Sequence, residues 1–333
     1  MIVMTAAATT AFADDNGLLP VPEIAGGQLK IRGFAQMFAT DVGNAQANVD
    51  FSVFRVKGIY ERGWLKIGSE INFAEFDEES SNWLRELWVG AKLTDKLEVR
   101  TGRLFLASGY ATPPMFVLET VQYPEAAFFS CYGWGVQFNY LGKRWEARLD
   151  ITDGSDSSFP DGESGRTLIC SGRAQRKFDA GSLGSTFQWS EDLWRLGLDA
   201  EVLPVKSLTL RGLVCYELVA DEKTSDRIGI YLLAAYRPAK ARWFELHAQA
   251  DYVGRLAKEW VEYQRIKADD GTVSVKRVEM ESDGTSDTVL TFGTRFFYGK
   301  DDCLSLTVDC QIPLAEEAAN MDPTILGRLQ FRF

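Results

Sequence analysis

The chain has 333 residues, 46% of them hydrophobic and 25% charged, with a formal net charge of −11 and a mean hydropathy of −0.14. No stretch approaches the roughly 20 consecutive apolar residues that a membrane helix needs, so this chain could span a membrane only as a closed β-barrel. All-β barrels of this length commonly fold as one unit. Apolar residues spread through the chain by alternation fit such a barrel.

The first residues resemble the end of a secretory signal. Met1–Ala13 is apolar, and Ala11-Phe12-Ala13 forms a small-x-small cleavage site before Asp14, although no Lys or Arg precedes it. We therefore expect a signal-peptide remnant over 1–13, with a disordered apolar tail as the alternative. A periplasmic segment over 14–27 and a barrel over 28–333 would follow.

The chain divides into segments of alternating polar and apolar residues, and the connections between them are short and long in alternation. This pattern predicts sixteen strands, although fourteen or eighteen would also fit it. The predicted strands are Gln28–Ala39, Phe51–Glu61, Leu65–Phe73, Leu84–Leu93, Leu97–Arg103, Gly135–Tyr140, Trp145–Thr152, Thr167–Lys177, Gly184–Ser190, Trp194–Leu203, Leu208–Glu217, Ile228–Arg237, Trp243–Tyr252, Val289–Tyr298, Leu304–Gln311 and Thr324–Phe333.

The clearest hairpin joins Gly135–Tyr140 to Trp145–Thr152. Its apolar residues, such as Phe138 and Leu149, fall on one face, whereas Gln137 and its polar neighbours fall on the other. Aromatic residues lie near the ends of several strands, where an interfacial girdle of a barrel belongs. They are Trp64, Trp145, Trp194, Tyr236, Tyr252 and Tyr298.

The last strand alternates up to an aromatic end. Ile325, Leu329, Phe331 and Phe333 share one face, and polar residues share the other. This ending resembles the signal that closes bacterial outer-membrane barrels and is read by the barrel-assembly machinery, which would then bind Phe333. A soluble β-sandwich also alternates. The even strand count, the signal remnant and the terminal Phe favour an all-β, transmembrane antiparallel barrel in a bacterial outer membrane.

Four motifs over 51–153 resemble the phosphate- and polyphosphate-selective porin family. They are Phe54–Tyr60 (FRVKGIY), Leu84–Gly90 (LRELWVG), Leu97–Leu104 (LEVRTGRL) and Gly133–Phe138 (GWGVQF). The resemblance implies an outer-membrane channel, a homotrimer and a third extracellular loop that folds into the lumen. In this chain that constriction loop would span 104–132 and would present Glu119 and Glu125 to the channel. The other long connection, Val253–Ser286, predicts an extracellular excursion that is partly a hairpin or a helix.

Selectivity of such a pore would come from charges on the inward strand face. Arg is suited to phosphate and carboxylate because of its fixed charge and planar fork. The alternative is that these charges hydrate the pore and pair across strands. The predicted pore-lining, anion-contacting residues are Lys30, Arg32, Arg55, Lys57, Arg100, Arg103, Arg148, Arg173, Arg195, Arg211 and Arg295.

The predicted constriction loop departs from the phosphate-selective pattern, since it carries no Lys and has Arg only at its entry, Arg103. We therefore expect passive diffusion of small hydrophilic solutes with at most a weak anion, or phosphate, preference. Acidic loops would meet lipopolysaccharide through divalent cations, and the barrel would contact outer-membrane lipid. A structural or adhesive surface protein with a plugged barrel is the second hypothesis.

Enzymatic activity is not expected. His247 is the only histidine, and its predicted inward position with Asp251 on the same strand is more typical of a pore-lining residue than of a catalytic base. The five cysteines have no metal-type spacing and are predicted to be small residues of the barrel wall. We therefore expect no catalytic residue, no metal, no cofactor and no nucleic-acid partner.

Overall fold

The structure is a computed structural model. It describes residues 23–42, 48–73, 83–106, 132–153, 168–220, 224–256, 258–267, 273–281, 285–299, 302–314 and 323–332. Predictions that concern the signal remnant at 1–13, most of 14–27, Glu119, Glu125 and Phe333 lie outside these residues, as does nearly all of the constriction loop.

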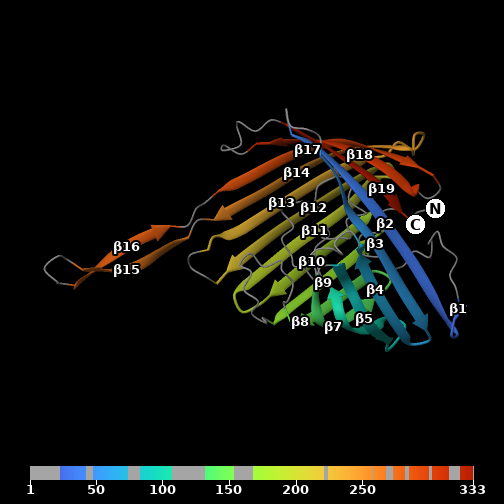
Figure 1. The fold of residues 1–333 in the computed structure, drawn as a ribbon, viewed down its shortest axis with the longest axis horizontal. Coiled ribbons are helices and arrows are strands. Elements are labelled where there is room, and N and C mark those ends of the chain that lie inside the picture. Colours follow the sequence, from blue (N-terminus) through green and yellow to red (C-terminus); the bar gives the residue numbers. More distant parts are fainter. Residues whose placement is uncertain are drawn as a thin grey trace.

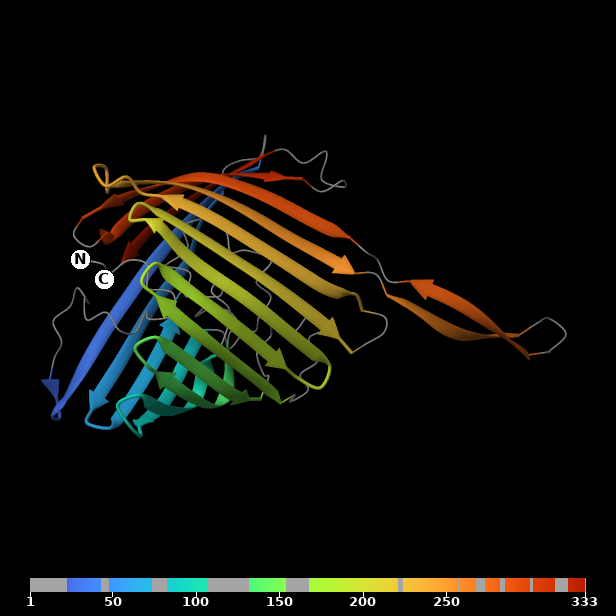
Figure 2. The same cartoon turned by 180° about the vertical axis from the view of Figure 1, so that it is seen from behind.

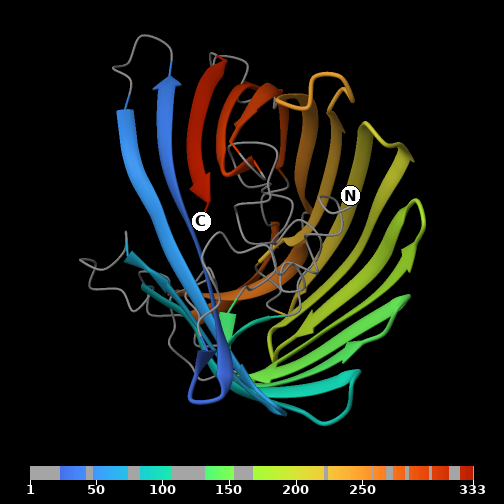
Figure 3. The same ribbon diagram turned by 90° about the vertical axis from the view of Figure 1, so that its right-hand side faces the viewer.

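Sixteen antiparallel strands form a closed barrel (Figures 1 and 3). Each barrel strand pairs with the next barrel strand along the chain, and the pairing of the last strand, β19, with the first barrel strand, β2, closes the ring. The predicted strand number is confirmed. The barrel strands are β2 (Gly27–Val42), β3 (Asn48–Arg62), β4 (Leu65–Asn72), β5 (Leu84–Lys92), β6 (Leu97–Phe105), β7 (Tyr132–Leu141), β8 (Trp145–Thr152), β9 (Ile169–Phe178), β10 (Gly181–Trp189), β11 (Leu193–Val205), β12 (Leu208–Val219), β13 (Asp226–Tyr236), β14 (Phe244–Leu256), β17 (Ser286–Tyr298), β18 (Leu304–Pro313) and β19 (Thr324–Arg332).

Several predicted boundaries were wrong by three residues or more, because the strands extend further than their clean alternation; β3 and β10 are examples. β10 begins at Gly181 rather than Gly184, since Gly181 to Trp189 pairs without interruption with both β9 and β11. β3 begins at Asn48 rather than Phe51, because its pairing with β2 continues past a register shift to Asn48. No helix in the described part of the chain is long and apolar enough to cross a membrane.

The two ends of the barrel differ in their connections. At one end, every connection within the barrel is two to seven residues long, as between β3 and β4. At the other end the connections run up to the 29 residues between β14 and β17. β2 starts and β19 stops at the short-turn end. Because outer-membrane barrels have short periplasmic turns and long extracellular loops, the short-turn end is the periplasmic one.

The connection from β14 to β17 contains a separate hairpin, β15 (Glu259–Lys267) and β16 (Val273–Glu281), paired from Glu259↔Glu281 to Lys267↔Val273. It projects away from the long-loop end of the barrel (Figures 1 and 2). Of the two forms predicted for this connection, the hairpin is confirmed. A two-residue strand, β1 (Glu23–Ile24), pairs with the start of β2 at the opposite end.

The outer face of the barrel is apolar. In β11, Leu196 and Leu198 are 50% and 64% exposed, whereas Arg195 and Asp199, at alternate positions, are each 2% exposed. A soluble protein has the opposite arrangement, so this alternation requires an apolar medium around the barrel. The predicted aromatic residues Trp64, Trp145, Trp194, Tyr236 and Tyr298 are exposed on the outside near strand ends.

Candidate functional site: the lining of the lumen

The polar inner face is the candidate site, because it brings together charged side chains from all sides of the ring. Of the eleven predicted lining residues, ten lie on this face by strand register or ion pairing: Lys30, Arg32, Arg55, Lys57, Arg100, Arg148, Arg173, Arg195, Arg211 and Arg295.

Arg103 is different. The register pairs it with Leu87 and Trp134, whose side chains are 44% and 41% exposed on the outside of the barrel. Arg103 itself is only 8% exposed, as buried as the inward arginines, and Gly102 (φ 132°) disturbs the alternation just before it, so the lumen position of Arg103 stays a prediction. The neighbouring Leu104 is buried, 1% exposed, so the entry to the predicted loop is apolar rather than cationic.

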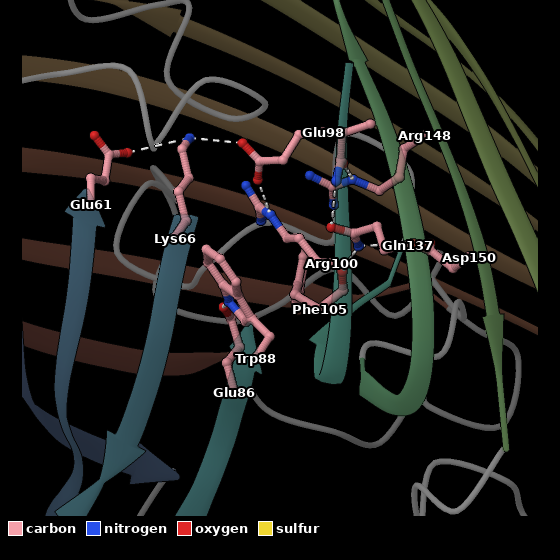
Figure 4. A network of polar contacts seen from close by, with 11 residues as sticks. Glu61, Lys66, Glu86, Trp88, Glu98, Arg100, Phe105, Gln137, Arg148 and Asp150 are labelled. Atoms are coloured by element: carbon pink, nitrogen blue, oxygen red, sulfur yellow. Dashed lines mark hydrogen bonds and ion pairs between the residues drawn. The ribbon is translucent and has the colours of Figure 1, made fainter. Parts of the chain in front are cut away.

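A chain of ion pairs crosses the inner face of β3, β4 and β6 (Figure 4). The Lys66 Nζ atom lies 3.3 Å from Glu61 Oε1 and 2.7 Å from Glu98 Oε2, and Glu98 also pairs with Arg100. Glu61 and Lys66 are cross-strand neighbours, Lys66 reaches Glu98 across β5, and Arg100 lies two residues after Glu98 on the same face of β6. Each cation in this chain is therefore already neutralised by the barrel itself.

A second group lies beside it on β3 to β5. The Lys57 Nζ atom lies 2.6 Å from Glu86 Oε1 and 3.5 Å from Glu70 Oε2. The indole Nε1 of Trp88 donates to Glu86 Oε2 at 3.0 Å, and the Arg100 guanidinium stacks 4.2 Å above the Trp88 ring. This cation–π contact links the two groups into one charged surface, the ion-pair wall: Lys57, Glu61, Lys66, Glu70, Glu86, Trp88, Glu98 and Arg100.

The inner face continues over β7 and β8 as a relay of hydrogen bonds (Figure 4). Arg148 Nε donates to Asn139 Oδ1 at 2.9 Å, Asn139 donates to Gln137 Oε1 at 3.0 Å, and Gln137 donates to Asp150 Oδ1 at 2.8 Å. Ser171 on β9 also donates to Asp150. Side chains that hold one another in this way present fixed charges and dipoles to the lumen.

The ion pairing extends to β12. Three predicted anion-contacting arginines bind acids of other strands. Arg173 binds Asp199 across β10 through two nitrogen atoms. Arg195 binds Glu217 at 2.6 Å and Arg211 binds Glu201 at 2.9 Å, each on the adjacent strand. These pairs bear out the alternative interpretation, in which lumen charges pair across strands. They leave less positive charge for solute than the residue types suggest.

The only histidine is part of a buried pair. His247 Nε2 on β14 lies 2.7 Å from Asp309 Oδ1 on β18, and neither side chain is exposed. The contact spans β17, where the intervening residue is Gly293. A Cβ atom at Gly293 would lie 2.0 Å from Asp309 Oδ1 and 2.4 Å from His247 Nε2. Glycine is thus what allows the pair to meet across the strand.

β17 to β19 carry a cationic surface with fewer partners, which we call the arginine wall: Arg295, Ser305, Thr307 and Arg328. Register places Arg295, Thr307 and Arg328 in one row across the three strands. Among the described residues, the Arg295 guanidinium contacts the ring of Phe297 at 4.9 Å, and its Nε atom has no hydrogen-bond partner. The hydroxyls of Ser305 and Thr307 also lack partners there. Buried polar groups of this kind are usually satisfied by water or by a ligand.

Some functional side chains were not predicted. Trp88 lies on the inner face, 2% exposed, and Ser305 and Thr307 belong to the arginine wall. The sequence did hold a signal for Trp88, because it lies two residues after the predicted inward residue Glu86 and therefore shares its face of the strand. Cys215 is also on the inner face, in the row of Glu217, and is fully buried. The alternation of β12 could have shown this.

Comparisons with known proteins agree with this architecture. No protein-family model matches the sequence, and no curated protein matches it. Among solved structures, the chain is similar to OmpT, an outer-membrane protein of Vibrio cholerae, in its trimer form (10% identity, TM-score 0.63, covering 92% of this chain and 100% of that one).

It is also similar to OmpF of Salmonella typhi in complex with daunomycin (10% identity, TM-score 0.60, covering 92% and 98%) and to an anion-selective porin of Comamonas acidovorans (12% identity, TM-score 0.60, covering 92% and 100%). The chain thus has the fold of bacterial outer-membrane barrels, porins among them, and its apolar outer face is suited to that membrane.

Proposed function

We propose that the protein is an outer-membrane porin that lets small hydrophilic solutes diffuse passively through a water-filled lumen. One observation carries this proposal: a closed ring of sixteen strands is apolar outside and charged inside. Barrels of 16 strands are wide enough for an aqueous channel. Continuous charge on the inner face keeps such a channel hydrated.

The preference among solutes is for anions, and it is weak. Most lining cations pair with acids of the barrel, as Arg195 does with Glu217. The arginine wall is the exception, because Arg295 has no ion pair among the described residues and lies beside the hydroxyls of Thr307 and Ser305. Guanidinium and hydroxyl donors together suit phosphate or carboxylate groups.

The constriction loop and the trimer are further parts of this proposal. Leu104 and Leu106, which lead into the loop, are 1% and 0% exposed, which supports a segment packed within the barrel. We place residues 107–131 there, with Glu119 and Glu125 facing the channel. Small outward residues on β2, β3 and β19, including Gly33, Gly58 and Gly327, favour close packing of subunits in a homotrimer.

Single-channel recording in planar bilayers tests the proposal. We expect stepwise ohmic conductance and, across a potassium chloride gradient, a reversal potential shifted modestly toward that of chloride. Addition of phosphate should reduce the chloride current if phosphate enters the arginine wall. A folded barrel that conducts nothing would overturn the porin proposal.

The projecting hairpin favours a second candidate, a structural or adhesive surface protein with a closed barrel. β15 and β16 extend beyond the long-loop end, where they can reach other surfaces (Figure 2). A silent barrel that nevertheless binds cells or matrix, and that loses binding when 259–281 is deleted, would support this candidate. Conductance that survives the deletion unchanged would support the porin.

Catalysis is not part of the proposed function. In the chemically suggestive pair, His247 Nε2 lies 2.7 Å from Asp309 Oδ1 across Gly293, which is the geometry of a structural contact between strands. We expect the His247→Gln variant to keep any hydrolytic background of the purified protein toward ester and peptide substrates. Hydrolysis by the wild type that disappears in this variant would establish an enzyme.

A further inference from the structure

The periplasmic end of the barrel is ringed by exposed positive charge, in contrast to the net charge of −11 for the chain. Within the described residues of that end, the exposed charged side chains are two acids, Asp95 and Asp179, and nine bases: Arg62, Lys92, Lys96, Lys143, Arg144, Arg176, Lys206, Lys240 and Arg242. None of the nine bases forms an ion pair with a described residue.

The opposite end has the reverse balance. There the exposed charged residues of the described part are the acids Glu191, Asp192 and Asp287 and the base Arg255. The charge is thus separated along the barrel axis. Acids near the short turns that do pair, such as Asp302 with Arg237 and Glu146 with Lys177, are already neutralised and do not offset the nine bases.

The bases are interleaved with exposed aromatic rings on the outer surface. Arg176 pairs in register with Trp145, and its guanidinium lies 5.5 Å from the Trp145 ring and 5.0 Å from that of Phe178. Both rings are about half exposed. Arg144 lies alongside, since its carbonyl accepts a hydrogen bond from the Lys177 amide at 2.8 Å.

The turn between β13 and β14 repeats this arrangement. Lys240 and Arg242 are exposed beside Trp243, which is 59% exposed and stacks on Phe296 with ring centroids 6.3 Å apart. Exposed Trp rings mark the depth at which lipid headgroups meet the hydrocarbon. Basic residues at the same depth are therefore within reach of headgroup phosphates.

We propose that this basic periplasmic rim binds the anionic headgroups of phospholipids in the periplasmic leaflet. Attraction of Lys and Arg to an anionic lipid surface supplies the energy, and the neighbouring aromatic rings set the depth. A soluble acidic polymer would not need bases placed at the aromatic girdle, so the position of Arg176 over Trp145 and Phe178 favours lipid. The inference depends on the barrel and its orientation, not on conductance.

The test uses the full chain in phosphatidylcholine vesicles with increasing fractions of phosphatidylglycerol. Quenching of Trp fluorescence by brominated forms of each lipid gives their relative association constants. The wild type should prefer phosphatidylglycerol severalfold at low salt and lose the preference near 1 M salt, where the Debye length is about 3 Å. The K143Q/R144Q/R176Q variant should lose most of this severalfold preference, because each base near an anionic surface contributes to the attraction.

Two matched variants complete the experiment. Arg255→Gln removes an exposed base from the opposite rim and should leave the preference unchanged, whereas D95N/D179N should raise it. Circular dichroism and the urea-unfolding midpoint establish that each variant is folded. Equal association of both lipids with the wild type would overturn the proposal. So would a preference that the triple variant retains, or binding of soluble polyglutamate that falls in that variant while lipid selectivity does not.

Discussion

The ion-pair wall and the arginine wall are both charged and both face the lumen, yet they differ in how their charge is used. On β3 to β6, Lys57 and Lys66 each contact two acids, so the surface is close to neutral. On β17 to β19, Arg295 contacts an aromatic ring and has an unpartnered Nε atom. The number of lining cations therefore does not measure anion selectivity; the number without a protein acid does.

The largest effect is expected from a substitution that disturbs β17, the strand that carries Arg295 of the arginine wall. Gly293→Ala puts a Cβ atom 2.0 Å from Asp309 Oδ1 and 2.8 Å from the Val308 carbonyl oxygen. Strain of this kind costs about 1–3 kcal/mol, and the His247–Asp309 contact must separate. We expect a lower midpoint in urea unfolding, followed by tryptophan fluorescence in lipid vesicles.

Gly212→Ala is the control for that prediction. Its Cβ atom would meet Leu232 Cδ2 at an ordinary 3.4 Å on the outer face of β12, away from the strands proposed for subunit packing. Its unfolding midpoint should stay close to that of the wild type. Equal midpoints for the two alanine variants would show that the close approach at Gly293 does not hold the strand in place.

The next largest effect concerns selectivity. Arg295→Gln removes a lining cation that forms no ion pair with a described residue. A unit charge about 10 Å from an ion in water changes its energy by ~0.4 kcal/mol, a factor of about two. We expect the chloride-to-potassium permeability ratio to fall by roughly that factor, measured from the reversal potential in a salt gradient.

Arg195→Gln is the matched comparison, since Arg195 is neutralised by Glu217. If the two walls differ as we infer, Arg195→Gln should lower the chloride-to-potassium permeability ratio by less than Arg295→Gln does. Glu217 still has Arg227 as a partner in that variant. A larger shift for Arg195→Gln than for Arg295→Gln would contradict the distinction between paired and unpaired cations.

The barrel could be predicted from the sequence because strand alternation is local: in β11, Leu196 and Arg195 point to opposite faces whatever the partner strand. Charge pairing could not be predicted in the same way. Whether Arg173 meets Asp199 depends on register across two strands, and register is not visible in a single segment. The lumen position of Arg103 stays a prediction for a similar reason, since the strand alternation that would place its side chain is disturbed at Gly102, which has a φ of 132°.

The smallest effect on ion selectivity is expected from a substitution in the ion-pair wall, and it tests whether paired charges influence the permeating ions. Glu86→Gln removes one acid from Lys57, yet the new amide oxygen can still accept the Trp88 Nε1 hydrogen bond, so the ring keeps its place. Lys57 also retains Glu70 at 3.5 Å, which limits the charge that is released. The chloride-to-potassium permeability ratio should therefore rise, by less than the roughly twofold change expected for an isolated charge. An unchanged ratio in a folded E86Q barrel would mean that these pairs are too far from the ion path to matter, and that the arginine wall alone sets the selectivity.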